Sequence, residues 1–239
     1  DPRMLERPFT LAGPESFNAL ALDLFRVHAA QNPVYRGFLQ GLGVDPLTVN
    51  SIDLIPFLPI GVFRNHRVLL EGLDPRSFFT SSGTTGAVTS HHHVPWPELY
   101  ERSFMTSFRA VYGDPAEWRI LALLPAYLER EGSSLVYMAH KLIAATGDLL
   151  SDTYLYKHAE LADVLRRSEA EGRKTLLIGV TFALLDLAEQ FPQQLPNTVI
   201  METGGMKGRR PEIVREELHR ILKNAFHVPK VHSEYGMTE

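Results

Sequence analysis

The chain has 239 residues, 44% of them hydrophobic, and a formal net charge of -4. This length supplies enough core for one large domain or two small ones, and the mildly acidic balance argues against a nucleic-acid partner, which usually requires a concentrated basic face. Because the chain contains no cysteine, disulfides, thiolate metal sites and a cysteine nucleophile are excluded within these residues.

Membrane and export signals are also missing from the sequence. The longest apolar run, residues 120–128, is interrupted by Pro125 and is too short to cross a membrane. No signal-peptide pattern opens the chain, so a cytoplasmic protein is expected. The chain begins at Asp1 and ends on HSEYGMTE, directly after a predicted buried strand, whereas termini usually lie in exposed polar segments. We therefore expect a fragment of a longer protein.

Helical spacing of apolar residues marks the first half of the chain. Residues 15–31 predict an amphipathic helix, and residues 97–112, which repeat an aromatic side chain every four positions, predict a second helix with an aromatic core face. Between them, residues 50–77 carry three prolines and are expected to be irregular. We expect residues 1–50 to form an N-terminal helical segment packed on a main domain of residues 51–239.

Strands and helices alternate over the second half. The apolar pattern predicts strands at 119–124, 174–180, 198–205 and 229–236. It predicts helices at 133–145, 158–172, 182–191 and 210–226. Ser133 caps the first of these helices, Gly172 stops the second, and Pro211 is expected at the start of the last. This alternation predicts an α/β fold with a largely parallel sheet flanked by helices.

Ligands of parallel sheets bind outside the carboxyl ends of the strands. Three loops follow predicted strands and are therefore candidates: PAYLEREGS (125–133), ETGGMKGRR (202–210) and SEYGMTE (233–239). A fourth segment, SSGTTG (81–86), has glycines that let backbone N–H groups approach an anion and hydroxyls that add donors. It lacks the Gly-Lys-Ser/Thr ending of a Walker A loop, and either a phosphate cradle or a plain turn fits its composition.

The second loop pairs two glycines with basic residues. Gly204 and Gly205 would let a flat ligand such as a purine lie against the backbone, or would form a tight β-to-α turn. Lys207, Arg209 and Arg210 follow them. Cations near a helix N-terminus interact unfavourably with the helix dipole, which hints that an anion lies close to them.

The last loop offers three kinds of contact. The Tyr235 ring can stack on a base, the Thr238 hydroxyl can bond a phosphate, and the Glu239 carboxylate can hold magnesium.

In combination, SSGTTG, the double glycine and YGMTE resemble the adenylate-forming superfamily of acyl-CoA ligases. Five longer stretches are similar to the acyl-protein synthetases, the fatty acid–protein ligases of bacterial bioluminescence fatty-acid reductase systems. These stretches are IPFLPIGVF, LALLPAYLEREGSSLVYM, GVTFALLDLAE, METGGMKGRRPEI and HSEYGMTE. The resemblance runs over residues 51–239.

The resemblance implies ATP-dependent activation of a carboxylic acid, expected to be fatty, as acyl-adenylate. The acyl group then passes to a protein thiol and on to an acyl reductase or acyl-accepting partner, with ATP and Mg²⁺ as cofactors. The residues implied for the β- and γ-phosphates are Ser81, Ser82, Gly83, Thr84, Thr85 and Gly86. Those implied for adenine and the acyl path are Gly204, Gly205, Met206 and Tyr235, while Thr238 contacts the α-phosphate and Glu239 binds magnesium. Tyr127 corresponds to an aromatic or histidine near the carboxylate, or is a core tyrosine.

Several departures from the family pattern matter. The phosphate loop lacks the lysine found in many superfamily members, and the acyl-accepting cysteine is absent. The ribose-binding aspartate and the C-terminal catalytic lysine normally lie beyond YGMTE, and ATGDLL (145–150) precedes that motif, so it is read as a helix end and turn. A truncated adenylate-forming N-terminal part is therefore expected. The alternatives are a phenylacetate-type acyl- or aryl-CoA ligase and a non-catalytic fragment that retains the fold.

Two histidine patterns suggest metal binding less well than other roles. Adjacent residues His91, His92 and His93 point in different directions, so we expect a loop flanking the phosphate site. Glu216 and His219 form a single Glu-x-x-His pair, which favours a solvated helix face, because a di-metal bundle requires two such pairs.

Overall fold

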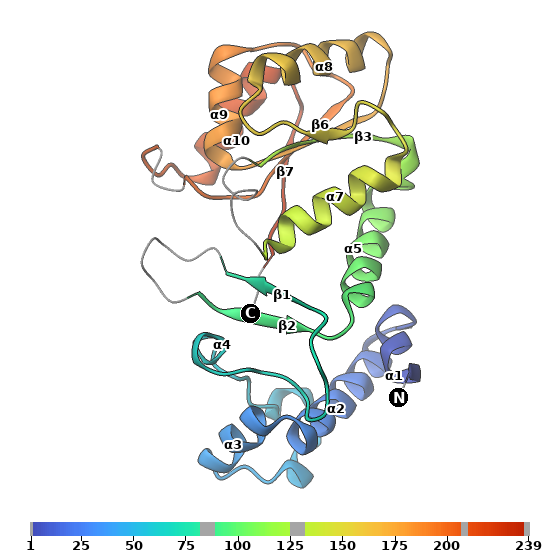
Figure 1. Ribbon diagram of the computed structural model, residues 1–239, viewed down its shortest axis with the longest axis vertical. Coiled ribbons are helices and arrows are strands. Elements are labelled where there is room, and N and C mark those ends of the chain that lie inside the picture. Colours follow the sequence, from blue (N-terminus) through green and yellow to red (C-terminus); the bar gives the residue numbers. More distant parts are fainter. Residues whose placement is uncertain (1, 82–88, 125–131, 207–209, 237–239) are drawn as a thin grey trace. The chain divides into compact units, whose positions relative to one another are not determined.

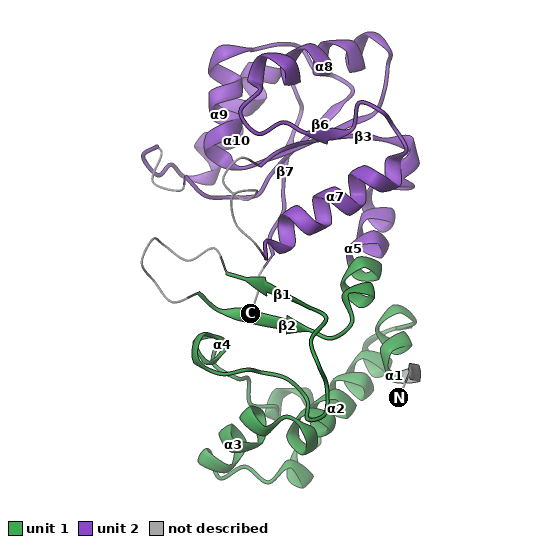
Figure 2. Ribbon diagram, in the orientation of Figure 1, with its two compact units in different colours: residues 1–103, 238–239 green, residues 104–237 purple. Residues whose placement is uncertain are grey.

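The computed structural model describes residues 2–81, 89–124, 132–206 and 210–236 (Figure 1). The chain divides into two compact units, with residues 1–103 in the first and residues 104–237 in the second (Figure 2). The division at residue 50 that the sequence suggested stays a prediction. No helix among the described residues combines the length and the apolar character that a membrane span requires.

Helices dominate the start of the first unit. They are α1 (Pro2–Glu6), η1 (Arg7–Phe9), α2 (Pro14–Gln31), α3 (Pro33–Gly41), η2 (Pro46–Thr48), η3 (Ile52–Leu54) and α4 (Val62–Asn65). The helix predicted over 15–31 is confirmed by α2, whereas α3 was not predicted. Asn32 separates the two, because its side chain accepts hydrogen bonds from the backbone N–H groups of Val34 and Tyr35 at 3.1 and 3.2 Å. This is the N-cap that starts a new helix.

The first unit also contains a two-stranded antiparallel hairpin. Strand β1 (Ser77–Thr80) pairs with β2 (His91–Val94), and Thr80 lies opposite His91. The expectation of a loop at the three histidines is therefore wrong. Alternation along the strand explains their arrangement: the His91 and His93 rings stack on each other at 6.5 Å, while the His92 ring stacks on Phe63 at 6.1 Å. Among the described residues, no group of three or more His, Cys, Asp or Glu side chains could hold a metal ion.

Helix α5 (Pro97–Tyr112) begins in the first unit and continues into the second, and it confirms the predicted aromatic helix. The second unit then contains η4 (Pro115–Glu117) and the strands β3 (Arg119–Leu123), β4 (Asp152–Thr153), β5 (Thr175–Gly179), β6 (Thr198–Glu202) and β7 (Val231–Ser233). Its helices are α7 (Ser134–Thr146), α8 (His158–Ala170), α9 (Thr181–Gln190) and α10 (Arg215–Phe226).

The five strands form one parallel sheet in the order β4-β3-β5-β6-β7. Figure 1 shows α7 on one side of this sheet and α8, α9 and α10 on the other. Every residue of β3 and β5 is buried, as expected of central parallel strands covered on both faces. The predicted α/β fold with a largely parallel sheet and flanking helices is confirmed.

A buried ion pair at the amino end of β3 explains the ATGDLL stretch. Helix α7 ends at Thr146, and Gly147 follows with φ +61°. The next residue, Asp148, accepts hydrogen bonds from the buried Arg119 guanidinium at 3.0 and 3.2 Å, and Arg119 also donates to Ser168 at 2.9 Å. ATGDLL is therefore the helix end and turn that the sequence predicted.

Element boundaries differ most near the candidate loops. The strand predicted over 198–205 ends at Glu202, so both glycines lie in the loop that follows it. Helix α10 begins at Arg215, because its N-cap residue, Val214, is still extended (φ -72°, ψ 153°). Pro211 therefore lies before the helix, and the prediction that it occupies the helix start is wrong.

Candidate functional site

The order of the strands indicates where the second unit can bind a ligand. After β3 the chain adds β4 on one side of β3 and then returns to add β5 on the other side. In sheets of this kind, the crevice at such a reversal lies outside the carboxyl ends of the strands. The reversal here lies between β3 and β5. The loop after β3, with Tyr127, lies outside the described residues.

The turn from β5 into α9 depends on Gly179, a residue that was not identified from the sequence. A Cβ atom at Gly179 would lie 2.7 Å from both Cγ and Cδ2 of Leu184, whose side chain is fully buried. Only glycine therefore fits without a shift of the buried Leu184 side chain. The Gly179 carbonyl also accepts the backbone N–H of Thr203 at 3.0 Å, which ties the end of β5 to the segment after β6. The signal in the sequence was the glycine at the end of a buried strand.

The two glycines after β6 leave their backbone open on one side. Gly204 and Gly205 have φ values of +75° and +89°, a backbone region that residues with a side chain rarely adopt. Among the described residues, no atom apart from those of the two chain neighbours would lie within 4 Å of a Cβ at Gly204. Met206 follows with a side chain that is only 2% exposed. The backbone of the pair can thus be approached closely, while the methionine side chain packs inside the unit.

Tyr235 lies at the matching position after β7. Glu202 pairs with Ser233 in the parallel register of β6 and β7. Gly204 and Tyr235 each follow that last pair by two residues, so they share one edge of the sheet. The Tyr235 side chain is 83% exposed, which leaves its ring available to stack on a ligand.

Glu202 links these two segments and was not identified from the sequence. Its side chain is 6% exposed, and its carboxylate accepts the Gly204 N–H at 2.8 Å and the Ser233 hydroxyl. Nothing in the sequence distinguishes this glutamate, because its partner Ser233 is 31 residues away. Burial, together with the Glu202 carboxylate, raises the pKa of Glu234 above its ordinary value.

Arg210 forms ion pairs with carboxylates of the protein itself. Its guanidinium pairs with Asp186 and with Glu189 of α9, the latter at 2.7 Å. The hydrogen bonds that Arg210 donates to Glu189 and Asp186 raise its pKa above the ordinary arginine value. The anion expected to balance this cation is therefore supplied by the protein itself. Lys207 and Arg209 lie outside the described residues.

Ser81, in the first unit, closes the base of the β1–β2 hairpin. Its backbone N–H donates to the Ser90 carbonyl at 3.1 Å, and its hydroxyl accepts the Ser90 N–H at 3.0 Å. The hydroxyl thus already has a structural partner. The rest of the proposed phosphate segment, Ser82 to Gly86, lies outside the described residues, as do Thr238 and Glu239.

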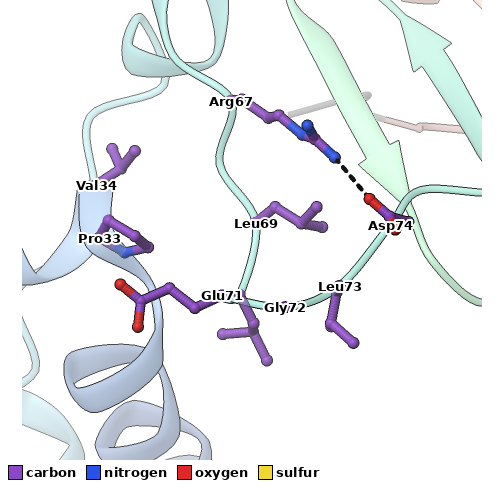
Figure 3. A pocket seen from close by; sticks show the side chains of 9 residues that line it. Pro33, Val34, Arg67, Leu69, Glu71, Gly72, Leu73 and Asp74 are labelled. Atoms are coloured by element: carbon purple, nitrogen blue, oxygen red, sulfur yellow. Dashed lines mark ion pairs between the residues drawn. The ribbon is translucent and has the colours of Figure 1, made fainter.

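A shallow pocket of about 330 Å³ opens elsewhere in the first unit (Figure 3). It is lined by Pro33, Val34, Arg67 and the segment 69–74, and Arg67 and Asp74 face each other at 3.8 Å. None of the site residues predicted from sequence lines it.

Comparison with known proteins confirms the resemblance for an N-terminal region. Residues 5–93 match the family model described as acyl-protein synthetase, LuxE. The match includes the SSGTTG segment and begins before residue 51, where the similar motifs start. No curated protein matches the chain.

One solved structure shares the fold. The crystal structure of 2-hydroxyisobutyryl-CoA ligase in the postadenylation state, in complex with R3-HIB-AMP, has a TM-score of 0.57 and 12% sequence identity. The similarity covers 99% of this chain and 48% of the ligase chain. The chain therefore spans about half the length of that ligase and has the fold of its corresponding part.

Proposed function

We propose that this chain supplies the nucleotide-binding part of an ATP-dependent ligase that activates a fatty acid as acyl-adenylate for transfer to a protein thiol. In the first step, a carboxylate oxygen attacks the α-phosphorus of ATP, and the bond to the β-phosphate breaks to release pyrophosphate. In the second, the thiol sulfur attacks the acyl carbonyl and AMP leaves. The acylated protein would then serve an acyl reductase.

The observation that carries the proposal is the pair formed by the Gly204–Gly205 backbone and the exposed Tyr235 ring at neighbouring carboxyl ends of a parallel sheet. An open glycine backbone and an aromatic ring at one edge suit a purine, because every base has a face that can stack. The match of residues 5–93 to acyl-protein synthetases supports an acid as the second substrate.

The remaining residues of the proposed site follow the resemblance. Ser81 to Gly86 would hold the β- and γ-phosphates, Met206 would border the acyl path, and Tyr127 would lie near the carboxylate. Thr238 would contact the α-phosphate. Magnesium, when bound, would neutralise charge that develops on the phosphates, and the Glu239 carboxylate is its proposed ligand.

A second candidate is a ligase that transfers the acyl group to coenzyme A. The solved structure with the shared fold, a CoA ligase, favours this acceptor. The two candidates differ only in the thiol. Incubation with radiolabelled dodecanoate, ATP and magnesium, together with either coenzyme A or a thiol-containing partner protein, separates them by whether the label enters acyl-CoA or protein.

The proposal is tested by calorimetric titration with dodecanoyl-sulfamoyl-adenosine, a non-hydrolysable acyl-adenylate analogue. We expect Tyr235→Ala to weaken binding by about tenfold or more, because stacking of a base on an aromatic ring contributes about 1–3 kcal/mol. The matched control is Tyr156→Ala, which removes a half-exposed tyrosine from the segment between β4 and α8.

Both outcomes of the titration are informative. Equal affinity of the Tyr235→Ala variant and the wild-type chain would reject the stacking role. Failure of the folded wild-type chain to bind the analogue would favour the non-catalytic alternative. The double variant Ser82→Ala/Thr84→Ala is expected to lose binding of ATP with magnesium if SSGTTG holds phosphates.

A further inference from the structure

Glu202 is a buried acid with no part in the chemistry proposed above. It is the last residue of β6, and its side chain is 6% exposed. Removing a carboxylate from water is costly unless hydrogen bonds and opposite charges compensate. Its hydrogen bonds therefore indicate what the fold gains by burying it.

Those hydrogen bonds reach two separate segments. The β6 loop (residues 203–206) is held by the Gly204 N–H, which donates to Oε2 of Glu202 at 2.8 Å. The β7 loop (residues 234–236) is held at its first residue, Glu234, and at the preceding residue, Ser233. The Ser233 hydroxyl donates to Oε1 of Glu202, and the Glu234 N–H donates to the Glu202 backbone carbonyl at 2.8 Å.

Two side chains of α10 lie near the same carboxylate oxygen at a greater distance, and one of them, Arg215, contributes a positive charge. Nε of Arg215 lies 3.8 Å and Nε2 of His219 lies 3.7 Å from Oε1 of Glu202. The Glu234 carboxyl, on the β7 loop, is close enough for its pKa to be raised in part by Glu202. One side chain thus connects the end of β6, the end of β7 and the first turns of α10.

We infer that Glu202 is a positioning residue that holds the β6 loop and the β7 loop in one fixed arrangement, so that the Gly204 backbone and the Tyr235 ring face one ligand. Only the identity of that ligand rests on the proposed function. The coupling of the two loops is a property of the free chain, because every hydrogen bond that creates it is within the protein.

Removal of the hydroxyl of Ser233 tests this coupling most directly. Ser233 donates to Glu202, and the acceptor of the Gly204 N–H, the Glu202 carboxylate, is still present in Ser233→Ala. If Glu202 couples the loops, the freed carboxylate moves, and the Gly204 amide should exchange its hydrogen at least about fivefold faster, as expected when a charge-assisted bond weakens.

The same strand offers a matched control at its opposite end. The Thr198 hydroxyl donates to Oε1 of Glu169 at 2.7 Å, again a hydroxyl bonded to a glutamate beside β6. Thr198→Val removes this hydroxyl and keeps the shape of the side chain. We expect it to leave amide exchange at Gly204 and Tyr235 within twofold of wild type, since the amino end of β6 lies away from both loops.

Variants of Glu202 itself then separate hydrogen bonding from charge. Glu202→Ala should speed exchange in both loops, whereas Glu202→Gln should restore most of the protection. The amide oxygen of glutamine can accept the Gly204 N–H, and its amide nitrogen can donate to the Ser233 hydroxyl oxygen. If Glu202 were merely structural, Glu202→Ala would lower the free energy of unfolding and speed amide exchange equally in the two loops and in the central strands.

Binding of dodecanoyl-sulfamoyl-adenosine gives a second readout. We expect Ser233→Ala and Glu202→Ala to weaken binding by about fivefold or more and Thr198→Val to leave it unchanged. Unchanged Gly204 exchange in Ser233→Ala would overturn the inference, even if the wild-type chain binds the analogue. Conversely, faster exchange at Gly204 would support the coupling even if the wild-type chain binds no adenylate, which would reject the proposed function alone.

Discussion

At the residue scale, the contact between Gly179 and Leu184 fixes the turn that begins α9. A methyl group added at Gly179 would lie 2.7 Å from the Leu184 side chain, which is fully buried. We expect Gly179→Ala to lower the free energy of unfolding by about 1–3 kcal/mol, the usual cost of overpacking a core. Urea unfolding followed by tryptophan fluorescence measures this change.

Gly37 provides the control for that substitution. It lies inside α3, and no atom lies within 4 Å of the position that a Cβ would take, so the same added methyl group meets no obstacle. Gly37→Ala should raise the free energy of unfolding by up to about 1 kcal/mol, because alanine loses less backbone entropy in a helix. Equal effects of the two substitutions would contradict the role assigned to the Leu184 contact.

Residues differ in how far sequence alone could identify them. Tyr235 and the glycine pair stand in loops after apolar runs, where composition and position both indicate a site. Glu202 stands at the end of an apolar run, and its function depends on Ser233, whose distance cannot be known until the register of β6 and β7 is fixed. Long-range polar contacts of this kind are set by tertiary structure.

At the element scale, the junction of α2 and α3 contains a histidine that must stay neutral. Nδ1 of His28 lies 3.3 Å from the Asn32 amide nitrogen, whose oxygen is already committed to capping α3. The amide nitrogen can only donate, so Nδ1 of His28 must accept and cannot carry a proton. Burial lowers the pKa of His28 accordingly.

A pH dependence of stability follows from this junction. The unfolded chain binds a proton at His28 more readily than the folded chain, so the stabilisation is complete above about pH 6.5 and is lost as the pH falls below that value. We expect the urea midpoint to fall between about pH 7.5 and pH 5.5, and His28→Gln to reduce this fall. His66→Gln, at an exposed position, is the control. If the urea midpoint of His28→Gln falls as far as that of the wild-type chain, groups other than His28 cause the pH dependence.

Elements with strong local signals were predicted and the others were not. The buried runs of β3 and β5 and the cap at Ser133 are local features, and each element formed where expected. The hairpin was missed because HHHV in β2 has no apolar alternation, and its pairing with SFFT in β1 decides its structure. Helix α10 starts late because Val214, its N-cap residue, is still extended. Tertiary pairing overrides local preference in the hairpin.

At the scale of the whole molecule, the two compact units bury very different cores. The first unit has a small helical cluster made of Phe25, Ala29, Tyr35, Leu39 and Val49. The second unit contains a sheet whose two central strands are buried at every position. Because hydrophobic stabilisation scales with the apolar area removed from water, we expect the second unit to be the more stable.

The two tryptophans of the chain allow this expectation to be tested. Trp96 belongs to the first unit, and Trp118, which is buried, belongs to the second. Trp96→Phe leaves a fluorophore that reports only on the second unit, and Trp118→Phe leaves one that reports only on the first. We expect the Trp118 signal to change at a higher urea concentration than the Trp96 signal, because units with separate cores unfold in separate transitions. Coincident midpoints would instead mean that the helix shared by the two units, α5, couples them into one cooperative structure, and the difference in core size would then have no effect on where either unit unfolds.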